Sequence, residues 1–266
     1  MIKLICSDID GTLIEDGTCT LPEGFAELIK ELKKKGIMFV AASGRPYSSM
    51  RNLFKEVKDD IIFVCESGCL VIDKGEILMK KAIERPVMEE IVGKFRSLEG
   101  SDFFVSGVKG AYCEKENTPM HKWVRDEYKA DITAVDDVLK VDDEIIEVEL
   151  YNHKDAAGAA GEEFLAKYNG KNGVKAVGAG YMWLVCIRSD GGKGTAIEKI
   201  CQKYGILPEE VMAFGDGQND ADMVKFAGES YAVKGAHEDV VKNAKYTAPT
   251  WRENGVSKVI KERLNM

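Results

Sequence analysis

Residues 2–12, which read IKLICSDIDGT, decide the fold of this chain because an apolar run leads directly into two aspartates. The run 2–6 is apolar on both faces, as is typical of a strand buried in a parallel sheet. Asp8 and Asp10 follow this strand, and Gly11 permits a turn after them. Carboxylates are costly to bury, so a solvated Asp-Gly turn is the simpler interpretation. The position of both acids after a doubly buried strand favours a chemical function instead.

Strand and helix patterns alternate outward from this stretch. A helical pattern over 20–36 leads to a second strand at 37–42, and another helix separates that strand from a third at 61–65. The same pattern returns after the apolar run 183–187, with a further strand at 211–214. Repetition of this kind predicts parallel strands joined by right-handed crossovers.

The middle of the chain follows a different pattern. Residues 86–183 contain more alternating strands, such as EIIEVELYN at 144–152, with helical patterns between them. Alternation is typical of antiparallel sheets with two different faces. We therefore expect an α/β protein with a Rossmann-like parallel-sheet core, formed by 1–83 and 187–266, and an inserted α+β cap domain at 84–186.

Composition argues against several classes of protein. The 266 residues carry 37 basic and 45 acidic side chains, a net charge of −8, whereas a nucleic-acid-binding face needs excess basic charge. No apolar run approaches the length of a membrane span, and no signal-peptide pattern is visible. The seven cysteines are odd in number and mostly lie in apolar runs, which favours buried thiols in a reducing compartment. We therefore expect a cytoplasmic protein without nucleic-acid or membrane partners.

A second polar cluster, SGRP, follows the strand predicted at 37–42. Loops beyond the carboxyl ends of parallel strands line the ligand crevice. The Ser43 hydroxyl and the backbone near Gly44 are suited to a phosphate oxygen, and Arg45 is interpreted as an anion partner or a surface residue. A helix cap ahead of Pro46 is the alternative.

Two later clusters complete the pattern. In SDGGKGTA at 189–196, Lys193 opens a helix and offers a point charge suited to phosphate, although most lysines are simply solvated. In GDGQNDADM at 215–223, Asp216, Asn219 and Asp220 crowd a glycine-rich loop. Hard oxygen ligands at this density suit Mg²⁺, and a structural loop rich in Asx turns is the alternative. Because each cluster follows its own predicted strand, we expect all four to share one site.

The order DxDGT, SGRP, a lysine before a helix, and GDxxND with a methionine three residues on resembles the haloacid dehalogenase-like phosphatases. The insertion between the second and third motifs is similar to the Cof-type subfamily with its large cap. The resemblance implies that Asp8 is the nucleophile and forms an aspartyl-phosphate. It also implies that Asp10 acts as general acid and then as general base.

The same resemblance implies a Mg²⁺ ion held by Asp8, by the backbone carbonyl of Asp10, and by Asp216. Asp220 would orient Lys193 or a metal-bound water, and Arg45 would support the site. The residues implied to bind the transferring phosphoryl group are Thr12, Ser43, Gly44, Lys193 and Asn219.

Two stretches depart from the subfamily pattern. Glu66-Ser67-Gly68-Cys69 stands where Asn-Gly-Ala is common, and VKGA at 233–236 stands where Gly-Asn-Ala is usual. These departures concern substrate-side contacts and loop shape rather than the proposed nucleophile, metal or lysine. Core packing is the more common role for residues of these types, but six cap side chains are candidates for substrate contact: Tyr112, His121, Trp123, Arg125, Tyr181 and Trp183.

The sequence therefore predicts a Mg²⁺-dependent phosphatase acting on small phosphorylated metabolites, most plausibly sugar phosphates. Two alternatives remain open: a phosphomutase that resembles phosphomannomutase, and a protein that senses a sugar phosphate without turnover. We expect a monomer or a weak homo-oligomer.

Overall fold

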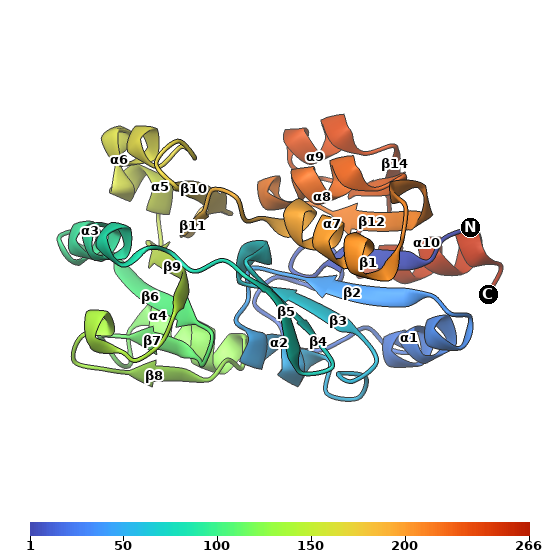
Figure 1. Ribbon diagram of the computed structural model, residues 1–266, viewed down its shortest axis with the longest axis horizontal. Coiled ribbons are helices and arrows are strands. Elements are labelled where there is room, and N and C mark those ends of the chain that lie inside the picture. The colour runs from blue at the N-terminus through green and yellow to red at the C-terminus, as the bar shows by residue number, and fades with distance from the viewer.

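The strand before Asp8, β1, lies in the middle of an eight-stranded sheet in the computed structural model, which describes residues 1–266 (Figure 1). Neighbouring strands from β14 to β3 pair in parallel, and β4 and β5 add an antiparallel hairpin at one edge. In sheet order the strands are β14 (Tyr246–Ala248), β13 (Glu229–Val233), β12 (Val211–Gly215), β1 (Leu4–Asp8), β2 (Met38–Ala42), β3 (Ile62–Cys65), β4 (Leu70–Asp73) and β5 (Glu76–Lys80).

Helices cover both faces of this core sheet. Side chains of β1 alternate between the two faces, with Ile5 in one apolar cluster and Leu4 and Cys6 in the other. All five residues of β1 are buried, as expected for a strand that is apolar on both faces. The helices of this domain are α1 (Phe25–Lys34), α2 (Tyr47–Leu53), α7 (Lys193–Tyr204), α8 (Ala221–Phe226), α9 (Glu238–Asn243) and α10 (Gly255–Leu264).

The middle of the chain forms a second domain with its own six-stranded sheet. Its pairs are antiparallel except for β7 with β8. In sheet order the strands are β10 (Val174–Ala179), β11 (Trp183–Arg188), β9 (Ile145–Tyr151), β6 (Asp102–Gly107), β7 (Ala111–Cys113) and β8 (Ile132–Ala134). The accompanying helices are α3 (Arg85–Arg96), α4 (Pro119–Lys122), α5 (Ala156–Ala160) and α6 (Glu162–Lys167).

The two domains lie side by side and are joined by two short connections, residues 81–84 and 189–192 (Figure 1). The α/β core with an inserted cap is therefore confirmed. The parallel pattern predicted to return after 183–187 is confirmed, because β12 pairs in parallel with β1 and β13, whereas β11 itself pairs antiparallel with β9 and β10 in the cap sheet. The boundary predicted at 187 thus falls inside β11. None of the helices is both long and apolar enough to cross a membrane.

Candidate active site

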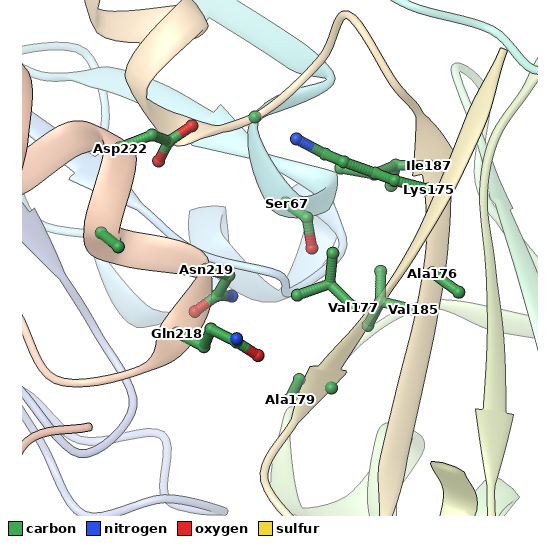
Figure 2. Close-up of a pocket in the computed structure, with 13 residues that line it drawn as sticks. Ser67, Lys175, Ala176, Val177, Ala179, Val185, Ile187, Gln218, Asn219 and Asp222 are labelled. Carbon is green, nitrogen blue, oxygen red and sulfur yellow. The ribbon is translucent and has the colours of Figure 1, made fainter. Parts of the chain in front are cut away.

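Two adjoining cavities lie between the core and the inner face of the cap sheet. The larger, of about 350 Å³, is lined on the cap side by β10 and β11 and on the core side by the turn Gln218–Asp220 and α8. Figure 2 shows Lys175, Val177 and Val185 projecting from the cap strands toward Asn219 and Asp222 of the core. The second cavity, of about 210 Å³, is lined by the site residues predicted from the sequence, except Thr12.

The four sequence clusters do converge on the second cavity. Asp8 ends β1, Ser43 follows β2, Asp216 follows β12, and all three line it. Lys193 reaches the cavity from a different kind of element: it is the first residue of α7 and follows a strand of the cap sheet, not a strand of the core sheet. Its position is set by the connection 189–192 and by the start of the helix.

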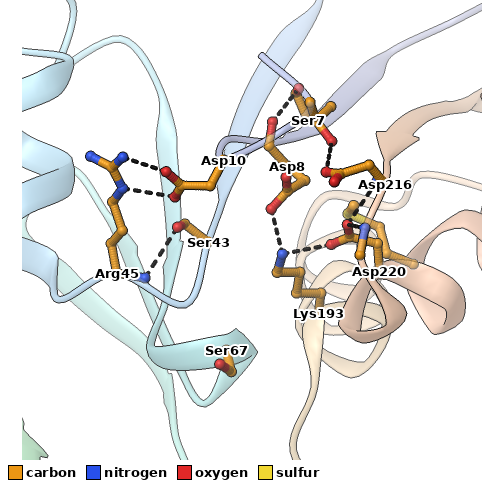
Figure 3. A network of polar contacts seen from close by, with 12 residues as sticks. Ser7, Asp8, Asp10, Ser43, Arg45, Ser67, Lys193, Asp216 and Asp220 are labelled. Atoms are coloured by element: carbon orange, nitrogen blue, oxygen red, sulfur yellow. Dashed lines mark hydrogen bonds and ion pairs between the residues drawn. The ribbon is translucent and has the colours of Figure 1, made fainter. Parts of the chain in front are cut away.

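Lys193 is the central cation of the site (Figure 3). Its side chain is 1% exposed, and its Nζ donates to Asp8 Oδ1 at 2.6 Å and to Asp220 Oδ1 at 2.5 Å. Burial lowers the pKa of Lys193, but Asp220 and Asp8 raise it further, so its net pKa lies well above the ordinary value. Burial and Asp220 raise the pKa of Asp8, although Lys193 acts in the opposite direction. Lys193 therefore holds both carboxylates in fixed positions.

Asp220 positions Lys193 and the loop after β12. While Oδ1 accepts from Lys193, Oδ2 accepts the backbone amides of Asp216 at 3.0 Å and Gly217 at 2.9 Å. Both oxygens thus have protein partners, which fits the predicted orienting role better than metal ligation.

Asp216 lies beside Asp8 and is supported by Thr12. The Thr12 hydroxyl donates to Asp216 Oδ1 at 2.5 Å. The sequence predicts phosphate binding by Thr12; in the structure Thr12 is fully buried and does not line the cavity, and its side chain holds Asp216. Burial, followed by the charge of Asp220, raises the pKa of Asp216 to about 6.

The acidic residues fit a divalent cation. Carboxylate oxygens of Asp8, Asp216 and Asp220 lie within 4.8 Å of one another, and Asp8 Oδ2 is buried without a hydrogen-bond partner. Gly11 makes this approach feasible: its φ is +82°, and a Cβ there would lie 2.4 Å from Asp216 Oδ2. Two crowded carboxylates with a free buried oxygen are the donor set expected for Mg²⁺, so Asp8 and Asp216 would hold the ion.

Asp10 is held by Arg45 rather than by the cluster around Lys193. Arg45 Nε donates to Asp10 Oδ2 at 2.8 Å, and Nη2 contacts the other oxygen. The guanidinium also lies 4.2 Å from the ring centroid of Tyr128 in the cap. Arg45 is 2% exposed, so its interpretation as a surface residue is wrong. It fixes the direction of the Asp10 carboxylate and links the core to the cap.

The remaining predicted phosphate contacts line the same cavity. Ser43, Gly44 and Asn219 surround the space next to Asp8 and Lys193. Ser43 Oγ accepts the backbone amide of Arg45 at 3.1 Å, which leaves the hydroxyl proton available for a ligand.

Most of the cap side chains named as candidates for substrate contact lie away from the cavity. Of the six candidates, Trp183 alone lines the cavity, where it joins Phe104, Tyr128 and Glu149. The other five are engaged elsewhere: Tyr112 with Asp143, His121 with the Asn117 amide, Trp123 against Gly17, Arg125 with Asp126, and Tyr181 in solvent at 83% exposed.

The departures from the subfamily pattern have structural partners. Glu66 Oε1 accepts the Tyr47 amide at the start of α2, at 3.1 Å, and Ser67 Oγ donates to Glu147 of the cap. Residues 233–236 form the turn after β13, and the amide of His237 that follows donates to the Asp216 carbonyl at 2.7 Å. Both segments therefore support the site through contacts that lie outside the second cavity.

Sequence reasoning missed the acidic face of the cap. Glu147 and Glu149 on β9 are both buried, and Glu149 lines the cavity. The alternation in EIIEVELYN was a usable signal, because it places the two glutamates on one face of the strand. That face would be solvated in an isolated domain, but here the core covers it.

Comparisons with known proteins agree with this geometry. Residues 5–260 match the family of haloacid dehalogenase-like hydrolases. The chain is 28% identical to the 5-amino-6-(5-phospho-D-ribitylamino)uracil phosphatase YbjI of Escherichia coli (strain K12), covering 97% of this chain and 95% of that protein. It is 26% identical to phosphoglycolate phosphatase 1 of Saccharolobus solfataricus, covering 99% and 96%. A crystal structure from Eubacterium rectale is 31% identical, with a TM-score of 0.85 over 98% of both chains.

Proposed function

Because the chain belongs to the haloacid dehalogenase-like hydrolases and is a phosphatase of that family, we propose that it is Mg²⁺-dependent and works through an aspartyl-phosphate on Asp8. We propose as substrate a small phosphorylated sugar or polyol. The observation that carries this proposal is the contact of Lys193 with both Asp8 and Asp220 beside Asp216, in a cavity that Asp10 also lines.

The reaction has two steps. In the first, a carboxylate oxygen of Asp8 attacks phosphorus, the bond from phosphorus to the leaving oxygen breaks, and Asp10 gives that oxygen a proton. In the second, Asp10 takes a proton from a water molecule that attacks the same phosphorus, which releases inorganic phosphate and restores Asp8. Lys193 and Ser43 orient the phosphoryl oxygens, since positioning and charge neutralisation supply most of the acceleration of phosphoryl transfer. Bound Mg²⁺ would offset the repulsion between Asp8 and the anionic phosphate.

The charge of the cavity supports a substrate whose leaving group is neutral. Six acidic side chains line it against two basic ones, and both basic side chains are already paired with aspartates. A second anionic group, as in phosphoglycolate, would find no free cation there. A phosphorylated ribityl chain, present in the substrate for which YbjI is named, meets the requirement. The adjoining 350 Å³ cavity offers room for a larger group attached to such a chain.

The test is release of inorganic phosphate from a panel of phosphorylated metabolites, with Mg²⁺ and with EDTA, for wild type and Asp8→Asn. We expect metal-dependent release that falls to background in Asp8→Asn, because the amide is a poor nucleophile of similar shape. Release that persists in the folded variant would refute the role of Asp8. Conversion of a sugar phosphate to an isomer without release of phosphate would favour the mutase.

We further propose a cytoplasmic location, supported by seven free cysteines, six of them buried. Free thiols are typical of reducing compartments. The partner expected is the small phosphorylated substrate, with no nucleic acid or membrane, and the chain is expected to act as a monomer or weak homo-oligomer. Sedimentation of the purified protein would measure the last point.

A further inference from the structure

Glu149 occupies the centre of the cap sheet, on the face that covers the active site. In the register of β9 it lies opposite Phe104 of β6 on one side and Val185 of β11 on the other. Its side chain lines the same 210 Å³ cavity as Asp8 and Lys193. A strand in the middle of a sheet is held on both sides, so this carboxyl group is presented to the cavity by rigid backbone.

The carboxyl group of Glu149 lacks protein partners. The residue is 7% exposed, and Oε1 is fully buried with no hydrogen-bond donor. Burial, followed by the nearby Glu66, raises its pKa well above the ordinary value, and no cation opposes this shift. An unpartnered buried acceptor costs about 1–3 kcal/mol, and buried polar groups are almost always satisfied in folded proteins. A ligand that donates hydrogen bonds would remove this cost.

The surroundings of Glu149 define the complementary ligand. Trp183 and Phe104 pack edge to face with ring centroids 6.0 Å apart, and both line the cavity. The indole nitrogen of Trp183 is also buried without a partner, and it can only donate. The cap thus places a carboxyl acceptor beside an aromatic wall, which is typical of sites for small polar ligands.

We infer that Glu149 is a specificity-determining residue that accepts a hydrogen bond from a hydroxyl or N–H group of the leaving group. This inference rests on the proposed function and deepens it. The carboxyl group selects phosphomonoesters whose remainder carries a hydroxyl or N–H group.

Glu147 offers a matched control. It lies two residues earlier on the same strand and is equally buried, but its Oε1 accepts from Ser67 at 3.1 Å and it does not line the second cavity. A general effect of removing a buried acid from the cap would appear in both variants. An effect on substrate choice should appear only at Glu149.

The experiment measures kcat/KM for D-ribitol 5-phosphate, phosphoglycolate and p-nitrophenyl phosphate in wild type, Glu149→Ala, Glu149→Gln and Glu147→Gln. In Glu149→Ala we expect the ratio of D-ribitol 5-phosphate to p-nitrophenyl phosphate to fall about 10- to 100-fold, the size of one hydrogen bond to a charged or buried acceptor. In Glu149→Gln we expect the ratios of D-ribitol 5-phosphate to p-nitrophenyl phosphate and to phosphoglycolate to stay within about threefold of wild type, since the amide keeps an acceptor oxygen at this position. A ratio equal to wild type in Glu149→Ala, a loss in Glu149→Gln as large as that in Glu149→Ala, or an equal change in Glu147→Gln would overturn the inference.

A binding measurement separates this inference from the proposed function. Titration calorimetry with D-ribitol 5-phosphate and Mg²⁺ compares Asp8→Asn with Asp8→Asn/Glu149→Ala. Affinity at least tenfold weaker in the double variant supports the role of Glu149 even where wild type shows no turnover. Absence of turnover in wild type on the whole panel counts against the phosphatase, whereas equal affinity of the two variants counts against Glu149.

Discussion

Replacing Glu66 by glutamine should make the stability of the protein less dependent on pH. Glu66 follows β3, is 2% exposed, and accepts the Tyr47 amide through Oε1. Its other oxygen has no partner. Burial raises the pKa of Glu66 from 4.5 to about 8, against a smaller opposing effect of the Tyr47 amide. At neutral pH the folded protein therefore keeps a proton on Glu66.

The sign of the effect follows from the direction of this shift. The unfolded chain releases the proton near pH 4.5, and the folded protein holds it until about pH 8. The contribution of Glu66 to stability is therefore fully present below about pH 4.5 and is lost as pH rises to about 8. Each pH unit inside this window removes about 1.4 kcal/mol, so the free energy of unfolding falls by about 3 kcal/mol between about pH 5.5 and about pH 7.5 from this residue alone.

Urea denaturation at three pH values within this window, in the presence of EDTA, measures the difference. Glutamine keeps an oxygen for the Tyr47 amide and carries no titrating proton. The free energy of unfolding of Glu66→Gln minus that of wild type should therefore increase by about 3 kcal/mol as pH rises from about 5.5 to about 7.5. Buried acids whose pKa does not depend on Glu66 contribute equally to both proteins and cancel in the comparison. Glu56→Gln, at an exposed position, should run parallel to wild type. If Glu66→Gln also ran parallel to wild type, Glu66 would be ionised in the folded protein and the reasoning would fail.

Two further predictions concern the cluster of charges. Lys193→Met removes the cation shared by Asp8 and Asp220. Turnover, measured by phosphate release, should fall about 100- to 1,000-fold, and the free energy of unfolding, measured by urea denaturation, should fall by about 3–5 kcal/mol. Turnover near that of wild type would contradict the role of Lys193. Gly11→Ala places a methyl group against Asp216 in a left-handed backbone conformation, so the Mg²⁺ concentration for half-maximal activity should rise at least about tenfold, the size of a 1.4 kcal/mol loss. An unchanged Mg²⁺ titration would mean that the metal is held elsewhere.

The sequence predicts the core domain well because its signals are local. The run before Asp8 places apolar side chains on both faces of the strand, and Ile5 and Cys6 do enter clusters on opposite faces of the sheet. A strand buried on both faces needs that pattern wherever it lies. The residues at its carboxyl end then meet those of the neighbouring strands through topology alone.

The boundary of the cap and its cavity-facing residues are harder to predict from the sequence, for a physical reason. The cap sheet is covered by helices on one face and by the core on the other. Because both faces of β11 are therefore buried, its first five residues, WLVCI, are as apolar as those of a parallel core strand. Periodicity reports burial and cannot distinguish burial within a domain from burial between two domains. For the same reason, residue type alone singled out Tyr181, which lies in solvent, and passed over Glu149, which lines the cavity.

The excess of acid in the cavity links the proposed metal requirement to the proposed choice of substrate. Lys193 is shared by two aspartates, and Arg45 is held by Asp10, so neither guanidinium nor ammonium is free for an incoming anion. A phosphate dianion entering among six carboxyl groups needs an added divalent cation, and Asp8 with Asp216 is the place where the chain can hold one. One such ion compensates one phosphate. A second anionic group would remain uncompensated opposite Glu149, and thus the same arrangement that demands Mg²⁺ favours substrates whose remainder carries no charge.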